Sequence, residues 1–176
     1  MPSAGDAGGS AGVTWALERA PNPRVIRLHT TVELTRATIE RCPPASPPEG
    51  LGSLLALAGV RSVELHRYRA RVNLSPGWDA KPAWEGIART IEAAWGAAAP
   101  LPGELPPRAF EVAYEGPRIV AESPEMAAPH PSLAAMFRIL GVAEAILETG
   151  WVWIRPGRLF SWGDVEGSVR RGLQIS

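Results

Sequence analysis

The sequence predicts an α+β protein built from two-layer sandwiches, in which an antiparallel sheet carries helices on one face and the whole unit is internally duplicated. The first observation is a near repeat: LALAGVRSVEL at 55–65 returns as FRILGVAEAIL at 137–147. The second is helical spacing of apolar residues before each Gly-Val, and the third is apolar and polar alternation after it.

Composition bounds the class of protein. Among 176 residues, Lys and Arg number 18 and so do Asp and Glu, so the formal net charge is zero. A nucleic-acid binder usually carries a basic stripe; the locally basic segment 67–71 is interpreted as the solvated face of a hairpin, and no nucleic-acid partner is expected. No run of residues approaches the roughly 20 apolar positions of a membrane span, and the first residues lack the features of a signal peptide. We therefore expect a cytoplasmic protein with no membrane partner.

Glycine and proline divide the chain into parts. Residues 1–12 are rich in Gly, Ala and Ser, which is typical of a flexible tail. Residues 96–107, GAAAPLPGELPP, form the best linker, because successive prolines remove backbone donors. The two remaining parts are 13–95, called the first half below, and 108–176, called the second half.

The first half predicts strands, a helix, a hairpin and a second helix, in that order. Strands are expected over 13–17 and 26–34, where apolar and polar residues alternate. A helix is expected over 51–58, with apolar residues at i, i+3, i+4 and i+7. The hairpin joins 63–65 to 70–74, and the last helix begins near Pro82. The apolar face of that helix comprises Trp84, Ile87, Ala88, Ile91 and Trp95.

The second half repeats this order with one strand fewer at its start. A strand is expected over 110–114, a helix over 133–140 and a hairpin from 145–147 to 152–154. Ser161 is a good N-cap for the last helix, with Asp164 as its partner in a capping box. The apolar face of that helix comprises Trp162, Val165 and Val169.

A constant spacing of 82 residues relates the two halves. It places Gly59 on Gly141, and both are expected at positive φ as helix C-cap residues, because glycine has no Cβ to resist that conformation. The same spacing places 36 and 40 on 118 and 122, and Pro47 on Pro129.

With these elements in order, the first half resembles the N-terminal domain of the Nfu/NifU-type scaffold proteins. Family members open with a strand, a Pro-Asn-Pro turn and a second strand, as at 13–28, and their helix ends in a Leu-Phe-x-Ile-x-Gly-Val pattern. Here 54–60 and, more closely, 136–142 match that pattern. A tryptophan opens the last helix, as at Trp84 and Trp162.

The resemblance implies an accessory role without catalysis. Cluster-carrying family members hold iron and sulfur on a separate C-terminal domain with a Cys-x-x-Cys motif, and here a second N-terminal-type copy stands in its place. The N-terminal domain has no catalytic residues to transfer. The leading hypothesis is thus a tandem-domain protein that is not an enzyme, carries no cofactor of its own and binds another protein within iron–sulfur cluster assembly.

Two alternatives stay open. Cys42 is the single cysteine, which excludes an internal disulfide; across a homodimer it would supply two thiolates to a metal or iron–sulfur site, although such sites want four ligands. The other alternative is a hydrolase or transferase with a hidden site. His29, His66 and His130 lack metal-ligand spacing and are interpreted as surface residues.

Trp151 and Trp153 are the candidate partner-binding residues, together with Ile146. They alternate with Val152 and Ile154, so they lie on the opposite face of their strand. At the matched positions the first half has Arg69 and Arg71. Because a stable monomer does not leave such a face wet without reason, we expect the two indoles to be buried against the first half, in a homodimer or in a partner complex.

Overall fold

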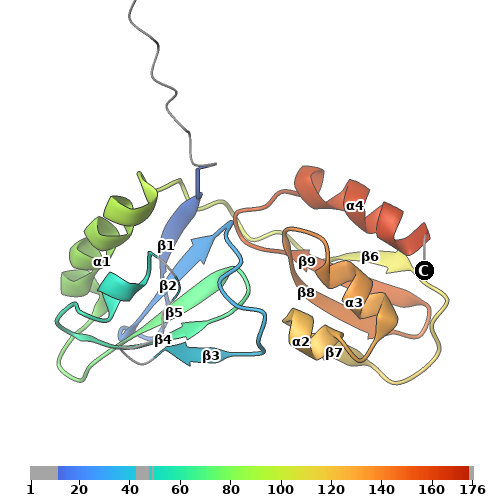
Figure 1. Cartoon of the computed structure of the whole chain (residues 1–176), viewed down its shortest axis with the longest axis horizontal. Coiled ribbons are helices and arrows are strands. Elements are labelled where there is room, and N and C mark those ends of the chain that lie inside the picture. The colour runs from blue at the N-terminus through green and yellow to red at the C-terminus, as the bar shows by residue number, and fades with distance from the viewer. Residues whose placement is uncertain (1–11, 43–47, 49, 175–176) are drawn as a thin grey trace, which may run out of the picture.

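In the computed structural model, which describes residues 12–42, 48 and 50–174, the chain forms two antiparallel sheets side by side (Figure 1). The first sheet comprises β1 (Trp15–Arg19), β2 (Val25–Thr30), β3 (Glu40–Cys42), β4 (Val60–Leu65) and β5 (Arg69–Leu74). The second comprises β6 (Arg108–Glu111), β7 (Ile119–Ala121), β8 (Val142–Glu148) and β9 (Trp151–Pro156). The helices are η1 (Gly52–Leu54), α1 (Ala80–Trp95), α2 (Pro124–Ala127), α3 (Pro131–Phe137) and α4 (Trp162–Gln174). The α+β class is as predicted.

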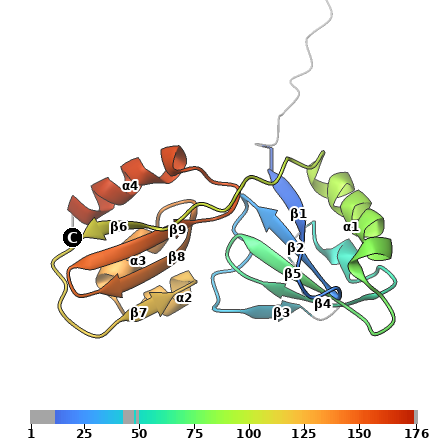
Figure 2. The same ribbon diagram turned by 180° about the vertical axis from the view of Figure 1, so that it is seen from behind.

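Each sheet carries helices on one face and has its own apolar core. In the first half, α1 and η1 cover the sheet on the side away from the second half (Figures 1 and 2). Ile26, Val72 and Ile87 are among the residues buried between sheet and helix. In the second half, α3 and α4 bury Leu133 and Val165 against the sheet. The faces opposite the helices are therefore available for contacts other than the core.

The two sheets follow the same path through the chain. The first has the strand order β1-β2-β5-β4-β3 and the second has β6-β9-β8-β7. Each has a register irregularity at the same point, between Val60 and Ser62 in β4 and between Val142 and Glu144 in β8. Only β1, predicted at 13–17, has no counterpart among the described strands of the second half.

Gly59 and Gly141 have φ values of 86° and 95°, as predicted. They are not helix C-cap residues, however, because each lies several residues beyond the end of its helix. The amide of Val60 donates to the Leu57 carbonyl, and that of Val142 donates to the Ile139 carbonyl. Each glycine is therefore the third residue of a four-residue turn, a position that favours positive φ in type II turns.

The predicted helix over 51–58 is wrong in its extent. Only Gly52–Leu54 forms a 3-10 turn, because glycine and serine at 52 and 53 are weak helix formers. Its counterpart is a full helix, α3, which has a proline in its first turn. It ends at Phe137, so the fourth apolar position, Leu140, falls outside the helix and is 66% exposed.

Strand prediction missed the edges of both sheets. The strand expected over 26–34 stops at Thr30, and β3 and β7 were not predicted, because three residues are too few for a periodic pattern. The constant spacing of 82 residues between matched positions does not hold at these edge strands. Glu40 pairs with Leu65, whereas Ile119 pairs with Leu147, the counterpart of Leu65. Glu40 therefore occupies the position of Ile119, and the match of 36 and 40 with 118 and 122 was wrong; Pro47 lies outside the described residues.

The two long helices begin as their sequences indicate. Asp79 caps α1 by accepting a hydrogen bond from the Lys81 amide. At α4, the Asp164 carboxylate accepts from the Ser161 amide and the Ser161 hydroxyl accepts from the Asp164 amide, which is the predicted capping box. The predicted face of α1 is buried at Ile87 and Ile91 and half-buried at its two tryptophans, and Ala80 and Ala83 in the first turn are buried as well.

The segment 96–107 contains no helix or strand and makes contacts with both halves. The Ala99 amide donates to the Trp15 carbonyl, and Glu104 pairs with Arg155 at 3.0 Å. In the part of the chain that the structure describes, no helix is long and apolar enough to cross a membrane.

Candidate functional site

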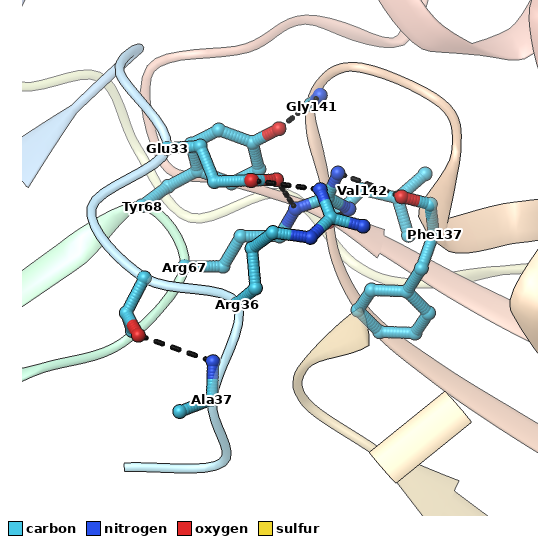
Figure 3. A network of polar contacts seen from close by, with 9 residues as sticks. Glu33, Arg36, Ala37, Arg67, Tyr68, Phe137, Gly141 and Val142 are labelled. Carbon is cyan, nitrogen blue, oxygen red and sulfur yellow. Dashed lines mark hydrogen bonds and ion pairs between the residues drawn. The ribbon is translucent and has the colours of Figure 1, made fainter. Parts of the chain in front are cut away.

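The turn between β4 and β5 joins the two halves of the molecule (Figure 3). The guanidinium of Arg67 donates to the carbonyls of Phe137 and Val142, each at 2.7 Å, and pairs with Glu33 at 2.8 Å. The side chain is 4% exposed. A planar guanidinium suits this role, because its donors point in several fixed directions at once.

Tyr68, the next residue, belongs to the core of the second half. It is 3% exposed, and its ring meets that of Phe160 edge-on with centroids 4.9 Å apart. Its hydroxyl accepts a hydrogen bond from the Gly141 amide at 3.0 Å. The interpretation of 67–71 as a solvated face was therefore wrong at these two residues. A basic hairpin turn has the same local pattern whether water or another sheet lies in front of it.

A cleft of about 200 Å³ opens beside this junction, between the uncovered face of the first sheet and the second half. Its lining includes Glu18, Arg27, His29, His66 and Arg69 from the first half, and Glu122, Glu144, Arg155 and Arg158 from the second, with Glu104 from the segment between them. Arginines, histidines and glutamates thus gather in one concave surface.

His29 and Glu18 form a pair at the floor of the cleft. Nε2 of His29 lies 2.6 Å from the Glu18 carboxylate, and His29 is 6% exposed. Burial lowers the pKa of His29 below its ordinary 6.5; the hydrogen bond to Glu18 opposes this shift, and the charges of Arg158 and Arg69 add to it. Burial acts to raise the pKa of Glu18, but the hydrogen bond and the surrounding positive charges outweigh it, so that pKa is lowered. At neutral pH a neutral imidazole therefore donates to an ionised carboxylate.

Of the other two histidines, one lies in the cleft and one does not. His66 lines the same cleft; burial, followed by the charge of Arg69, lowers its pKa, and nearby glutamates oppose the shift. His130 is the N-cap residue of α3, where it makes no side-chain cap bond. The surface interpretation was thus wrong for His29. Among the described residues that line the cleft there is no serine, threonine or cysteine nucleophile.

The predicted partner-binding residues come together on the second sheet, on the face opposite its helices. Trp153 pairs with Ala109 on one side and Ile146 on the other, and Ile146 pairs with Val120. These four residues, the tryptophan row, cross the whole sheet. Trp151 lies on the same face, two residues before Trp153 along the strand. Trp151 is 46% exposed and Trp153 is 36% exposed. Burial of the indoles against the first half was therefore a wrong alternative.

The same row of the first sheet is charged. There Arg27 pairs with Arg71, Arg71 with Glu64 and Glu64 with Arg41. Arg41 and Arg71 lie 3.2 and 3.6 Å from the Glu64 carboxylate. One sheet thus presents an ion-pair ladder to water where the other presents an apolar row.

Cys42 lies in the core of the first half, on β3. It is 1% exposed, and burial, together with the charge of Glu40, raises the pKa of its thiol. Among the described residues, no group of three or more His, Cys, Asp or Glu side chains could hold a metal ion. A bridging thiolate at Cys42 would require this edge strand to open.

Sequence reasoning found the tryptophans but missed Arg67, Tyr68, Arg69 and Arg155. One feature of the sequence could have drawn attention to the residues at 66–69. The two halves do not match there, because Tyr68 stands where the second half has Gly150. Comparison of the chain with protein-family models, with curated proteins and with solved structures yields no match.

Proposed function

We propose that this is a non-catalytic cytoplasmic protein that binds a partner protein on the tryptophan row and the adjoining Trp151. The observation that carries the proposal is the contrast between the two sheets. At four matched positions the first half has ions and the second has apolar side chains, and a row of apolar side chains across an exposed sheet is typical of an interaction surface.

The size of the surface favours a short segment of the partner over a large permanent interface. The exposed parts of the two indoles amount to on the order of 120–200 Å², if each ring can bury 150–250 Å². At about 25 cal/mol per Å² their burial contributes roughly 3–5 kcal/mol before the cost of ordering the complex. A stable protein dimer buries about 800 Å² on each side. The patch is therefore matched to a peptide-like partner.

The charges beside Trp151 favour a basic partner, because Arg155, two residues beyond Trp153 on the same face, is already paired with Glu104 and Glu144. Trp151 lies between Glu111 and Glu148 on the neighbouring strands, and Glu148 also accepts a hydrogen bond from the Trp153 indole. A second copy of the chain would bring a second set of carboxylates to this rim, and like charges would oppose it. In an extended segment that alternates apolar residues with Lys or Arg, the apolar side chains can pack on the tryptophans and the basic ones can pair with the glutamates. We therefore commit to such a segment as the occupant.

We further propose that the two halves are duplicated copies of an Nfu/NifU N-terminal-type domain and that the partner acts in iron–sulfur cluster assembly. The common strand path, the paired register irregularities and the paired glycine turns support the duplication. The link to cluster assembly is supported by the resemblance of 136–142 to the family pattern. The alternative scaffold role of Cys42 is tested by anaerobic reconstitution with iron and sulfide: an absorption band lost in Cys42→Ser would replace this proposal.

The binding proposal is tested with the whole protein and two synthetic peptides, one alternating leucine with lysine and the other leucine with glutamate. Each peptide carries a fluorescent dye, and binding is measured by the anisotropy of that dye, so the readout does not depend on the tryptophans that are replaced. We expect the lysine peptide to bind the wild type and the glutamate peptide not to bind. The double substitution Trp151→Arg and Trp153→Arg should abolish this binding while the melting temperature changes little, because both indoles are exposed.

Leu140→Arg provides the control for replacing an exposed apolar side chain by arginine. It removes an apolar side chain that is 66% exposed and adds one positive charge at a site away from the sheet, where the double variant adds two, and it should keep the binding of the wild type. If the double variant still binds the lysine peptide, or the glutamate peptide binds equally well, the proposal is wrong. A concentration-dependent dimer in ultracentrifugation that the double variant abolishes would identify a second copy as the occupant instead.

A further inference from the structure

The cleft between the two halves is lined by charged side chains, some with ion-pair partners and some without one among the described residues. Those with partners lie at the floor of the cleft. Glu18 accepts from His29 and lies 3.5 Å from Arg158 and 3.8 Å from Arg27. The Glu18 carboxylate thus has three partners, and the charge of the group is net positive. These residues belong to both halves, so they hold the cleft walls in place without needing a ligand.

Arg155 forms one side of the cleft and is only partly satisfied. One of its terminal nitrogens, Nη1, lies 3.0 Å from Glu104, and its Nε lies 3.6 Å from Glu144. That Nε is buried and has no hydrogen-bond partner among the described residues. A buried donor without an acceptor costs free energy, so its persistence in a cleft calls for an explanation.

Arg69 lines the cleft from the first half; it is exposed to solvent and has no ion-pair partner among the described residues. Within the described part of the chain its guanidinium has no hydrogen bond and no carboxylate within ion-pair distance. Burial, followed by the positive charge of Arg27, lowers its pKa. Arg71, two residues along the same strand, is paired with Glu64. The unpaired guanidinium is therefore the one that faces the cleft.

Two further polar groups in the lining have no partner of their own. The half-buried His66 ring makes no hydrogen bond to a described residue, and the Glu122 carboxylate, which is exposed to solvent, makes no ion pair with one; both line the cleft with Arg69. Guanidinium groups bind carboxylates and phosphates through short charge-assisted hydrogen bonds. A carboxylate accepts from an amine or a hydroxyl. The arginines are thus complementary to an oxyanion, and Glu122, whose charge acts on Arg69, is complementary to a donor group on the same molecule.

We propose that this cleft binds a small metabolite that carries a carboxylate or phosphate group, held by Arg69 and Arg155, and an amine or hydroxyl group accepted by Glu122. The volume of about 200 Å³ lies below the 300–1,000 Å³ of pockets for drug-sized molecules, so the ligand is small. The site is additional to the tryptophan face. Because both halves line it, the ligand would also stabilise their arrangement.

The test is an NMR titration of the arginine Nε–Hε signals of the full chain. The probes are inorganic phosphate, glycine, acetate and the neutral triol glycerol, each up to about 10 mM, which saturates a site with a dissociation constant near 1 mM. We expect phosphate, or glycine and acetate, to shift the Arg69 and Arg155 signals to saturation, and glycerol to shift neither. The responding anion distinguishes a phosphate ligand from a carboxylate ligand.

Three variants decide the outcome. Arg69→Gln should weaken binding at least about tenfold, the loss expected for one charge-assisted hydrogen bond. Arg71→Gln, on the same strand and face but outside the cleft, should bind as the wild type does. Glu122→Gln should strengthen phosphate or acetate binding and remove any preference for glycine over acetate. The proposal is overturned if no anion shifts the two signals, or if Arg69→Gln and Arg71→Gln bind alike.

Discussion

Replacing Arg67 by methionine should destabilise the protein by about 3 kcal/mol. The substitution keeps the apolar stem but leaves the carbonyls of Phe137 and Val142 without their donor, at distances of 2.7 Å in the native structure. Removing one partner of a buried ion pair costs about 3–5 kcal/mol. The Glu33 side chain is 27% exposed and can recover water, which places the cost at the lower end. For a chain of this size the melting temperature should fall by roughly 6–12 °C.

The measurement is urea denaturation followed by circular dichroism, with the slope of the transition recorded as well as its midpoint. Arg71→Met is the matched control, because Arg71 is half-exposed and makes a single 3.6 Å ion pair. It should change the free energy of unfolding by less than about 1 kcal/mol. Arg67→Lys should recover only part of the loss, since an ammonium group cannot reproduce the planar fork.

A loss below about 1 kcal/mol in Arg67→Met, similar to that of Arg71→Met, would refute the reasoning. It would mean that the two carbonyls and Glu33 reach water when the halves separate slightly. We also expect the unfolding transition of Arg67→Met to divide into two steps. The junction carries much of the coupling between two cores that are otherwise separate.

Three further predictions concern stability. Gly141→Ala should cost about 2–3 kcal/mol in chemical denaturation, because a Cβ there meets strained φ and would lie 2.8 Å from a Phe160 ring carbon. Gly77→Ala, at similar φ but in open space, should cost only about 1 kcal/mol; equal losses would show that the contact with Phe160 is unimportant. Since the pKa of His29 is lowered from 6.5, the unfolded chain binds a proton that the native protein does not, so stability should fall as pH drops below 6.5 towards the native pKa. His29→Gln should reduce that slope in thermal melts recorded across this range, leaving the part due to the other cleft histidine, and an unchanged slope would contradict the assignment.

Local pattern was sufficient wherever a residue's environment follows from the direction of its own backbone. Period-two alternation at 151–154 placed Val152 and Ile154 in the core and the two tryptophans outside it. Glycine at 59 and 141 implied positive φ, and Ser161 with Asp164 implied the start of a helix. Such features can be predicted from the neighbouring residues alone, because strand geometry and helix capping act over a few residues.

The short edge strands and the first helix were beyond the reach of that pattern. Three residues in β3 or β7 cannot show a period, and their pairing with β4 or β8 is decided by the sheet that is already formed. Likewise, Leu140 fits the helical spacing but lies past the end of α3, since the helix ends before the turn that Gly141 makes.

The junction and the cleft depended on tertiary structure alone. The sequence by itself indicated two similar α+β halves and, on the second, Trp151, Trp153 and Ile146 on the face away from the core. It could not decide that the turn at Arg67 and Tyr68 enters the second core, because a basic turn looks the same in water or in an interface. Nor could it bring Arg69 and Arg155 to one cleft. Their approach depends on how two sheets are set side by side, and that arrangement is fixed by a few long-range hydrogen bonds and ring contacts that no local period encodes.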